Sequence, residues 1–164
     1  MFRLNLFVLM VAAILATGCS DKIMTLEERL ASLPADTLFR IKADTSFSEA
    51  WEIRLRQPVD HRNPDGPRFT QQIFLYYAGA DRPVVVETEG YGARGGRNEL
   101  SSILHANLIR IEHRYFEEST PDSVDWKYLT TWQAATDHHR IIELFKPVFS
   151  GKWATTGISK GGQT

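Results

Sequence analysis

Alternating apolar and polar positions mark two strands in the first half of the chain. "WEIRLRQPV" at residues 51–59 places Trp51, Ile53 and Leu55 on one face and charged side chains on the other. "FTQQIFLYY" at residues 69–77 is a second strand pattern. The segment between them contains Asn-Pro and Asp-Gly pairs, which favour turns. The pattern therefore predicts an antiparallel hairpin with a long loop.

The pattern changes after residue 82. The unbroken apolar run Val84–Val86 is typical of a strand buried on both faces, as in a parallel sheet. A glycine-rich loop at 91–98 follows, and residues 107–116 and 152–157 predict two more strands. Strands alternating with a helix favour an α/β fold, here a mixed sheet that begins with a hairpin and is incomplete.

Two helices are predicted. Residues 24–34 begin with a Thr25–Glu28 capping box, and residues 130–146 begin with the matching pair Thr130 and Gln133. The second helix carries a stripe that is expected to face the core. Its members are Leu129, Trp132, Ala135 or Thr136, His139, Ile142 and Phe145.

The N-terminus reads as an export signal. The apolar run Leu6–Ala16 is too short to span a bilayer and follows Arg3, which predicts a signal peptide over residues 1–18. Cys19 is the single cysteine, and the order Ala-Thr-Gly-Cys resembles a bacterial lipobox, so lipidation of Cys19 is expected. The alternative is an ordinary signal peptide that leaves a free thiol.

Localisation and domain boundaries follow from that interpretation. The protein is expected in the bacterial cell envelope, as an outer-membrane lipoprotein or in the periplasm. Residues 19–44 are interpreted as a lipid-anchored tether with a short helix, and residues 45–164 as the N-terminal part of an α/β-hydrolase domain. A net charge of −1 without a basic run gives no support to nucleic-acid binding. No metal site and no cofactor are expected.

The chemistry gathers at the end of the chain. Gly157-Ile-Ser159-Lys-Gly161 follows a predicted strand, which is the setting of a nucleophilic serine on a tight strand-to-helix turn. Ser159 is therefore the candidate nucleophile. The backbone N–H of Lys160 and that of Gly90 or Tyr91 are the candidate oxyanion donors. The alternative is a structural or phosphate-binding glycine turn.

A catalytic base and acid are not evident in this stretch. Hydrolases of this fold carry Ser, then Asp or Glu, then His along the chain, whereas all five histidines here precede Ser159. The triad Asp and His are therefore expected beyond Thr164, and the segment by itself is expected to be inactive.

Several ordered blocks carry a family resemblance. The blocks are "QPVDH" (57–61), "EGYG" (89–92), "EHRYFEESTP" (112–121), "WKYLTTWQAATDHHRI" (126–141) and "TTGISKGGQT" (155–164). They resemble secreted bacterial tripeptidyl aminopeptidases of the α/β-hydrolase clan, and are similar to the prolylcarboxypeptidase and dipeptidyl-peptidase family. The resemblance implies a serine exopeptidase that cleaves peptides through an acyl-enzyme on Ser159, with a helical cap further along. Lys160 stands where the prolylcarboxypeptidase and dipeptidyl-peptidase family has tyrosine, which favours the resemblance to the tripeptidyl aminopeptidases.

Three questions stay open at this level. An esterase or lipase of the same fold and an inactive truncated lipoprotein are the alternative functions. Glu89 is a candidate partner for the free amino group of a peptide substrate, or else a brace for its own loop. Arg114 is expected to pair with Glu112, Glu117 or Glu118 in a structural network.

Overall fold

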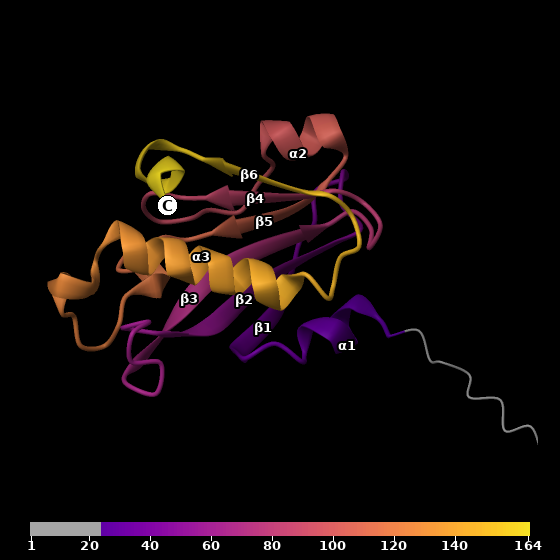
Figure 1. The fold of residues 1–164 in the computed structure, drawn as a ribbon. Coiled ribbons are helices and arrows are strands. Elements are labelled where there is room, and N and C mark those ends of the chain that lie inside the picture. The colour runs from indigo at the N-terminus through magenta and orange to yellow at the C-terminus, as the bar shows by residue number, and fades with distance from the viewer. Residues whose placement is uncertain (1–23) are drawn as a thin grey trace, which may run out of the picture.

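The computed structural model describes residues 24–164, so the predicted signal peptide and Cys19 lie outside the described residues. These residues form a six-stranded mixed sheet in the order β1-β2-β3-β5-β4-β6 (Figure 1). The strands are β1 (Ala35–Ile41), β2 (Glu49–Pro58), β3 (Arg68–Tyr77), β4 (Val84–Thr88), β5 (Asn107–Ile111) and β6 (Trp153–Gly157). The α-helices are α1 (Leu26–Leu30), α2 (Glu99–Leu104) and α3 (Thr131–Phe145).

The predicted hairpin and the change to parallel pairing are confirmed. β2 and β3 are antiparallel, with Trp51 opposite Leu75 and Ile53 opposite Ile73, and all four side chains are buried. β3 pairs antiparallel with β5, and β4 lies parallel between β5 and β6. The sheet is mixed and open, as the sequence pattern predicts.

Two elements were not predicted. β1 pairs antiparallel with β2, so residues 35–41 belong to the sheet. Its side chains are intermediate or exposed, with no regular alternation, so the strand lacks the pattern that would have indicated it. α2 begins after Asn98, whose side chain accepts a hydrogen bond from the Ser101 N–H at 3.1 Å. Because β1 precedes the hairpin, the strand predicted around Val84–Val86, third in the predicted order, is β4.

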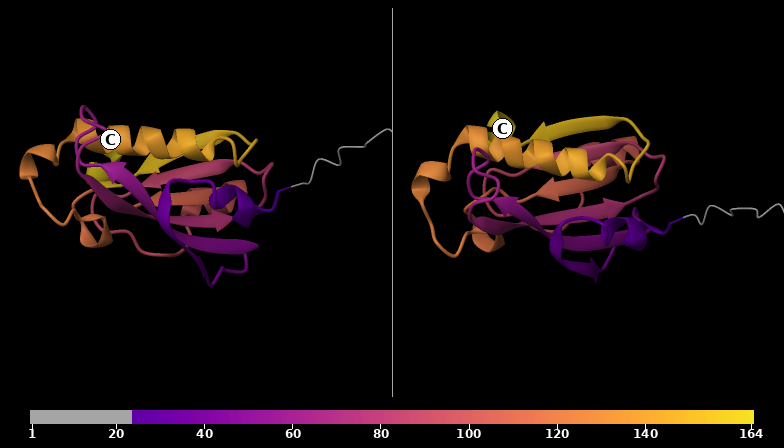
Figure 2. Two further views of the ribbon diagram at one scale, coloured as in Figure 1. Left: turned by 90° about the horizontal axis from the view of Figure 1, so that it is seen from below. Right: turned by 60° about the horizontal axis from the view of Figure 1, so that its bottom comes forward.

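Helices cover both faces of the sheet. α1 and α3 pack on one face, where Leu30, Ile141 and Phe145 join the main hydrophobic core (Figures 1 and 2). α2 lies over the opposite face, where Leu100 packs against a smaller core that includes Val85. The predicted capping box of α1 is present in full.

The predicted core stripe of α3 is wrong in part. Trp132 is 48% exposed and His139 is exposed, whereas the buried face includes Ala134, Asp137 and His138. Polar residues take core positions here because Asp137 has a buried ionic partner, described below. An apolar pattern alone does not show such a partner.

The N-terminus of α3 is capped in one direction only. Thr130 accepts a hydrogen bond from the Gln133 N–H at 3.2 Å, as predicted. The Gln133 side chain, however, donates to Asp60 and accepts from the His61 N–H at 2.9 Å, so the return half of the box is not formed. Gln133 instead joins α3 to the loop between β2 and β3.

The strand predicted over 107–116 ends early. β5 stops at Ile111, and the next residues form a turn in which Tyr115 and Glu117 have φ values of 68° and 37°. Left-handed backbone at two nearby non-glycine residues is unfavourable, so surrounding contacts must hold it. We call residues 113–119 the Phe116 turn.

Candidate active site

Ser159 stands at the carboxyl end of β6 in a strained backbone. Its φ is 54°, which is the left-handed region that costs a non-glycine residue about 1 kcal/mol or more. The side chain is exposed, and within residues 24–164 it forms no hydrogen bond. A strand, a strained serine and a following helical turn are the features of a nucleophile elbow. Ser159 therefore remains the candidate nucleophile.

The glycines of the motif are required by close packing. A Cβ on Gly161 would lie inside 3.0 Å of the Thr88 carbonyl, and one on Gly157 would lie 2.6 Å from Thr88 Oγ1. Gly162 is less crowded, with its nearest contact at 3.1 Å. The Thr88 hydroxyl also donates a 2.7 Å hydrogen bond to the Gly161 carbonyl. The end of β4 therefore supports the turn directly.

The structure brings the predicted oxyanion donors together. We call residues 89–98 the oxyanion loop; it leaves β4 beside the elbow at the end of β6 (Figure 1). A Cβ built on Gly90 would lie 2.9 Å from Lys160 Cβ and 3.3 Å from Lys160 N. In the described part of the chain, the N–H groups of Gly90, Tyr91 and Lys160 donate no hydrogen bond. Unpaired backbone N–H groups on Lys160, which follows the serine, and on the loop packed against it are what an oxyanion site requires.

The Lys160 side chain rests on aromatic rings. Its ammonium lies 4.7 Å from the centre of the Phe116 ring and 5.9 Å from that of Tyr91. The two rings form an edge-to-face pair with centres 5.1 Å apart. Burial lowers the pKa of Lys160. This aromatic support fixes the residue whose N–H is a candidate oxyanion donor.

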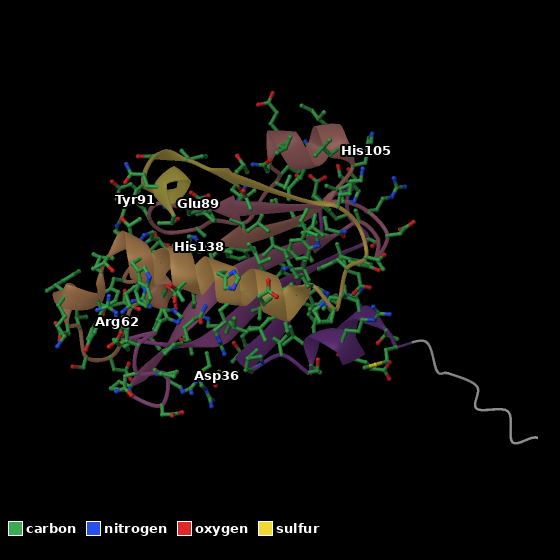
Figure 3. All side chains as sticks on the ribbon, viewed as in Figure 1. Asp36, Arg62, Glu89, Tyr91, His105 and His138 are labelled. Carbon is green, nitrogen blue, oxygen red and sulfur yellow. The ribbon has the colours of Figure 1, made fainter. Side chains whose placement is uncertain are left out.

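Glu89 lies at the start of the oxyanion loop, close to Tyr91 and the C-terminal turn (Figure 3). Its carboxylate is 3.5 Å from Arg110 Nε, and Arg110 also pairs with the buried Glu87. Burial, and then the nearby Glu87 carboxylate, raise the pKa of Glu89. The contact with Arg110 braces the start of the loop, while 22% of the Glu89 side chain remains exposed to solvent.

The histidines do not reach Ser159. His61 Nε2 lies 2.6 Å from Asp137 Oδ1, a histidine–carboxylate pair that was not predicted. The Asp137 carboxylate is also held by Arg114, through contacts of 2.7 and 3.0 Å. Arg114 therefore pairs with Asp137, and the prediction of Glu112, Glu117 or Glu118 as its partner is wrong. The prediction of a structural network at this site is confirmed.

His138 lies on α3 behind the elbow. It is buried, and it lines a cavity of about 400 Å³ together with Thr88, Gly157 and Gly161. Neither ring nitrogen has a hydrogen-bond partner among the described residues. Burial lowers the pKa of His138 to about 4, so the ring is neutral at pH 7.

The mixed sheet and the tight turn that carries Ser159 together define the class of the fold, an α/β-hydrolase. Residues 19–164 match the model of the PS-10 peptidase S37 family, and the chain belongs to that family. The resemblance read from the ordered sequence blocks is thereby confirmed.

Two curated relatives are similar to the chain. A prolyl tri/tetrapeptidyl aminopeptidase of Streptomyces mobaraensis is 44% identical over 111 residues, covering 66% of this chain and 23% of that protein. A lysosomal Pro-X carboxypeptidase of Bos taurus is 26% identical over 179 residues, covering 96% of this chain and 35% of that protein. The chain thus spans about a quarter to a third of these relatives.

A solved structure supports the fold. The acetyl xylan esterase from Paenibacillus sp. R4 superposes with a TM-score of 0.52 and 18% identity, over 84% of this chain and 50% of that one. At this identity the likeness shows the α/β-hydrolase fold alone.

Proposed function

We propose that the complete protein is a serine exopeptidase of the tripeptidyl aminopeptidase type, with Ser159 as its nucleophile. The observation that carries the proposal is the exposed, strained Ser159, followed by Lys160, whose unpaired N–H lies against Gly90. Membership of a peptidase family and the 44% identity to a tri/tetrapeptidyl aminopeptidase favour peptides as substrates.

The chemistry follows from this geometry. Ser159 Oγ attacks the scissile carbonyl carbon while its proton passes to a general base, and the carbonyl oxygen becomes an oxyanion. The N–H of Lys160 and that of Gly90 or Tyr91 stabilise the oxyanion, which contributes about 3 kcal/mol for each such donor. The leaving amine takes the proton as the tetrahedral intermediate collapses, and water then hydrolyses the acyl-enzyme. The base and its partner acid are expected from the sequence order to follow Thr164.

We also propose Glu89 as the partner of the substrate's free ammonium. Its carboxylate is partly exposed at the entrance to the oxyanion loop. An ammonium in a closed site needs a negative partner, because an unpaired charge there is costly. Arg110 shares Glu89, so this role competes with bracing the loop.

Attachment to the envelope is a separate proposal. A lipid on Cys19 would place the enzyme on a membrane surface, and the motif around Cys19 is the support for it. In residues 24–164 we find no helix with the length and apolarity to cross a membrane.

The decisive experiment uses Ser159→Ala in the complete protein. Turnover of a tripeptidyl amide should fall by at least about a thousandfold, leaving the residual rate that binding and the oxyanion donors give. A fluorophosphonate probe should label the wild type and not the variant. Near-normal turnover in Ser159→Ala would remove the assignment.

A further inference from the structure

Glu112 is a buried carboxylate that the proposed mechanism does not use. It follows β5 directly and has no exposed surface. Its own backbone is fixed on both sides: its N–H donates to the Gln72 carbonyl at 3.1 Å, and its carbonyl accepts from Gln71 Nε2 at 2.8 Å. The side chain therefore projects from a rigid position at the carboxyl end of the sheet.

The carboxylate accepts hydrogen bonds from two separate loops. Oε2 accepts from the Ala93 N–H at 3.0 Å, in the oxyanion loop. Oε1 accepts from the Ser119 N–H at 2.9 Å and from the Ser119 hydroxyl at 2.8 Å, at the end of the Phe116 turn. Glu112 thus joins both loops to the end of β5.

Both loops bear on the candidate oxyanion donors. The oxyanion loop carries Gly90 and Tyr91, and the Phe116 turn carries the ring that supports Tyr91 and the Lys160 ammonium. The Tyr91 carbonyl accepts the His113 N–H at 3.0 Å, which is a second link between the two loops. A shift of either loop therefore changes where the donors point.

Glu112 is held by neutral donors. In residues 24–164 no Lys, Arg or His forms an ion pair with it. Burial is the largest influence on its pKa and raises it, whereas the hydrogen bonds from Ala93 and Ser119 act in the opposite direction. A buried charge kept in place by backbone N–H groups requires those groups to stay where they are.

We propose that Glu112 is a positioning residue, whose carboxylate sets the oxyanion loop and the Phe116 turn so that the backbone donors face the oxyanion. This inference rests on the proposed function. Glu112 does not touch the reacting atoms; it acts through Ala93 and Ser119 on the loops that carry Gly90, Tyr91 and Phe116. Its effect belongs to the transition state rather than to substrate binding.

The substitution Glu112→Gln tests this with little change in shape. A glutamine offers one acceptor oxygen and one NH2 group, so whichever way the amide turns, a backbone N–H faces another donor. One loop is thereby released. Since misplaced donors weaken transition-state binding, kcat should fall about 10- to 100-fold with KM within about twofold.

The distinguishing readout is inhibitor binding to the complete protein. Ser159 Oγ adds to the carbonyl carbon of a tripeptide aldehyde: a C–O bond forms as the C=O π bond opens, and the Oγ proton passes to the general base. The former carbonyl oxygen then occupies the oxyanion site as a hemiacetal oxyanion. The matching tripeptide alcohol cannot do this. Glu112→Gln should weaken the aldehyde about 10-fold or more and leave the alcohol unchanged. Glu143→Gln, the same change at an exposed position on α3 outside both loops, should alter neither.

Other outcomes overturn the inference. Equal weakening of aldehyde and alcohol would show a general structural role, and unchanged binding of both would show no role. If circular dichroism shows that Glu112→Gln does not fold, Glu112→Asp replaces it in the comparison of aldehyde and alcohol binding. Aspartate keeps the charge but is too short to reach both loops, so the aldehyde should again be weakened selectively. A wild type that does not prefer the aldehyde, or an active Ser159→Ala, would instead overturn the proposed function.

Discussion

Arg114 donates two hydrogen bonds to Asp137, from Nε at 2.7 Å and from Nη2 at 3.0 Å, and neither side chain has exposed surface. Arg114 also donates to the carbonyls of Pro58, Val59 and Tyr128. A single buried guanidinium therefore joins the end of β2, the segment before α3 and α3 itself.

Removing one partner of this pair should be strongly destabilising. Asp137→Asn leaves the Arg114 charge buried without its counter-ion, so the free energy of unfolding should fall by about 3 kcal/mol or more. Urea unfolding of the complete protein measures it. Glu118→Gln removes an exposed partner of Arg54 and should change the free energy by less than about 1 kcal/mol. Equal losses in the two variants would contradict the assigned role of Arg114.

The two glycines after Ser159 should differ in tolerance. Gly161→Ala places a methyl group against the Thr88 carbonyl, whereas Gly162→Ala meets its nearest atom at 3.1 Å. Overpacking against backbone costs about 1–3 kcal/mol and moves the turn, so Gly161→Ala should lose both stability and most peptidase activity. Gly162→Ala should lose much less. Thermal unfolding and kcat on one substrate compare the pair.

Replacing Ser159 by glycine or by alanine should affect the stability of the protein differently, although both changes remove the nucleophile. Glycine adopts the φ of 54° without penalty, so Ser159→Gly should be about 1 kcal/mol more stable than Ser159→Ala. Both variants should be inactive. Identical stabilities would mean that the turn relaxes when the hydroxyl is removed.

His138 should make the protein sensitive to acid. Its pKa is near 6.5 when unfolded and about 4 when folded, so below pH 6.5 the unfolded chain binds the proton first. Stability should therefore fall as the pH drops from 6.5 towards 4, by at most about 3 kcal/mol for this group. His113, whose pKa burial also lowers, acts in the same direction. Asp137 opposes the shift of His138, and Arg114 adds to it.

A variant isolates that contribution. His138→Leu removes the titrating ring, so its loss of stability between pH 6.5 and 4 should be smaller than that of the wild type. His139→Leu, at the exposed neighbouring position, should keep the wild-type slope. Equal slopes in all three proteins would show that His138 is protonated without cost.

Lipidation can be tested directly. Cys19→Ala should shift the protein from the membrane fraction to the soluble fraction, while the wild type incorporates labelled palmitate. Wild-type protein found free in the periplasm without lipid would remove this proposal.

Much of the fold could be predicted because local patterns and pairing agree. The alternation around Ile53 and the continuous run at Val84–Val86 predicted an antiparallel and a parallel strand, and both are present. The serine motif predicted its own turn, because only glycine fits at positions 157 and 161. β1 was not predicted, because an edge strand whose side chains are partly buried or exposed gives no clear period.

The site was less predictable wherever long-range charges decide the structure. Asp137 reads as a solvent-facing helix residue until Arg114, 23 residues earlier, is known to lie beside it. The sequence pattern makes β5 five residues longer than it is. The chain turns after Glu112 with left-handed backbone at Tyr115 and Glu117, and the Glu112 carboxylate holds the turn through the Ser119 N–H. Such partners are set by tertiary contacts, and no local pattern indicates them.

The oxyanion loop follows β4 and the Ser159 turn follows β6, and these two strands are neighbours in the sheet but distant in sequence. Thr88 is opposite Gly157 in the parallel ladder, and its hydroxyl bonds to Gly161, 73 residues further on. The alignment of nucleophile and donors is thus set by the strand register, and the length of the chain that connects them does not enter. Insertions into the exposed part of that connection, such as around Asp122–Val124, should therefore leave the catalytic alignment intact, so that new substrate-contacting segments can be added there without rebuilding the site.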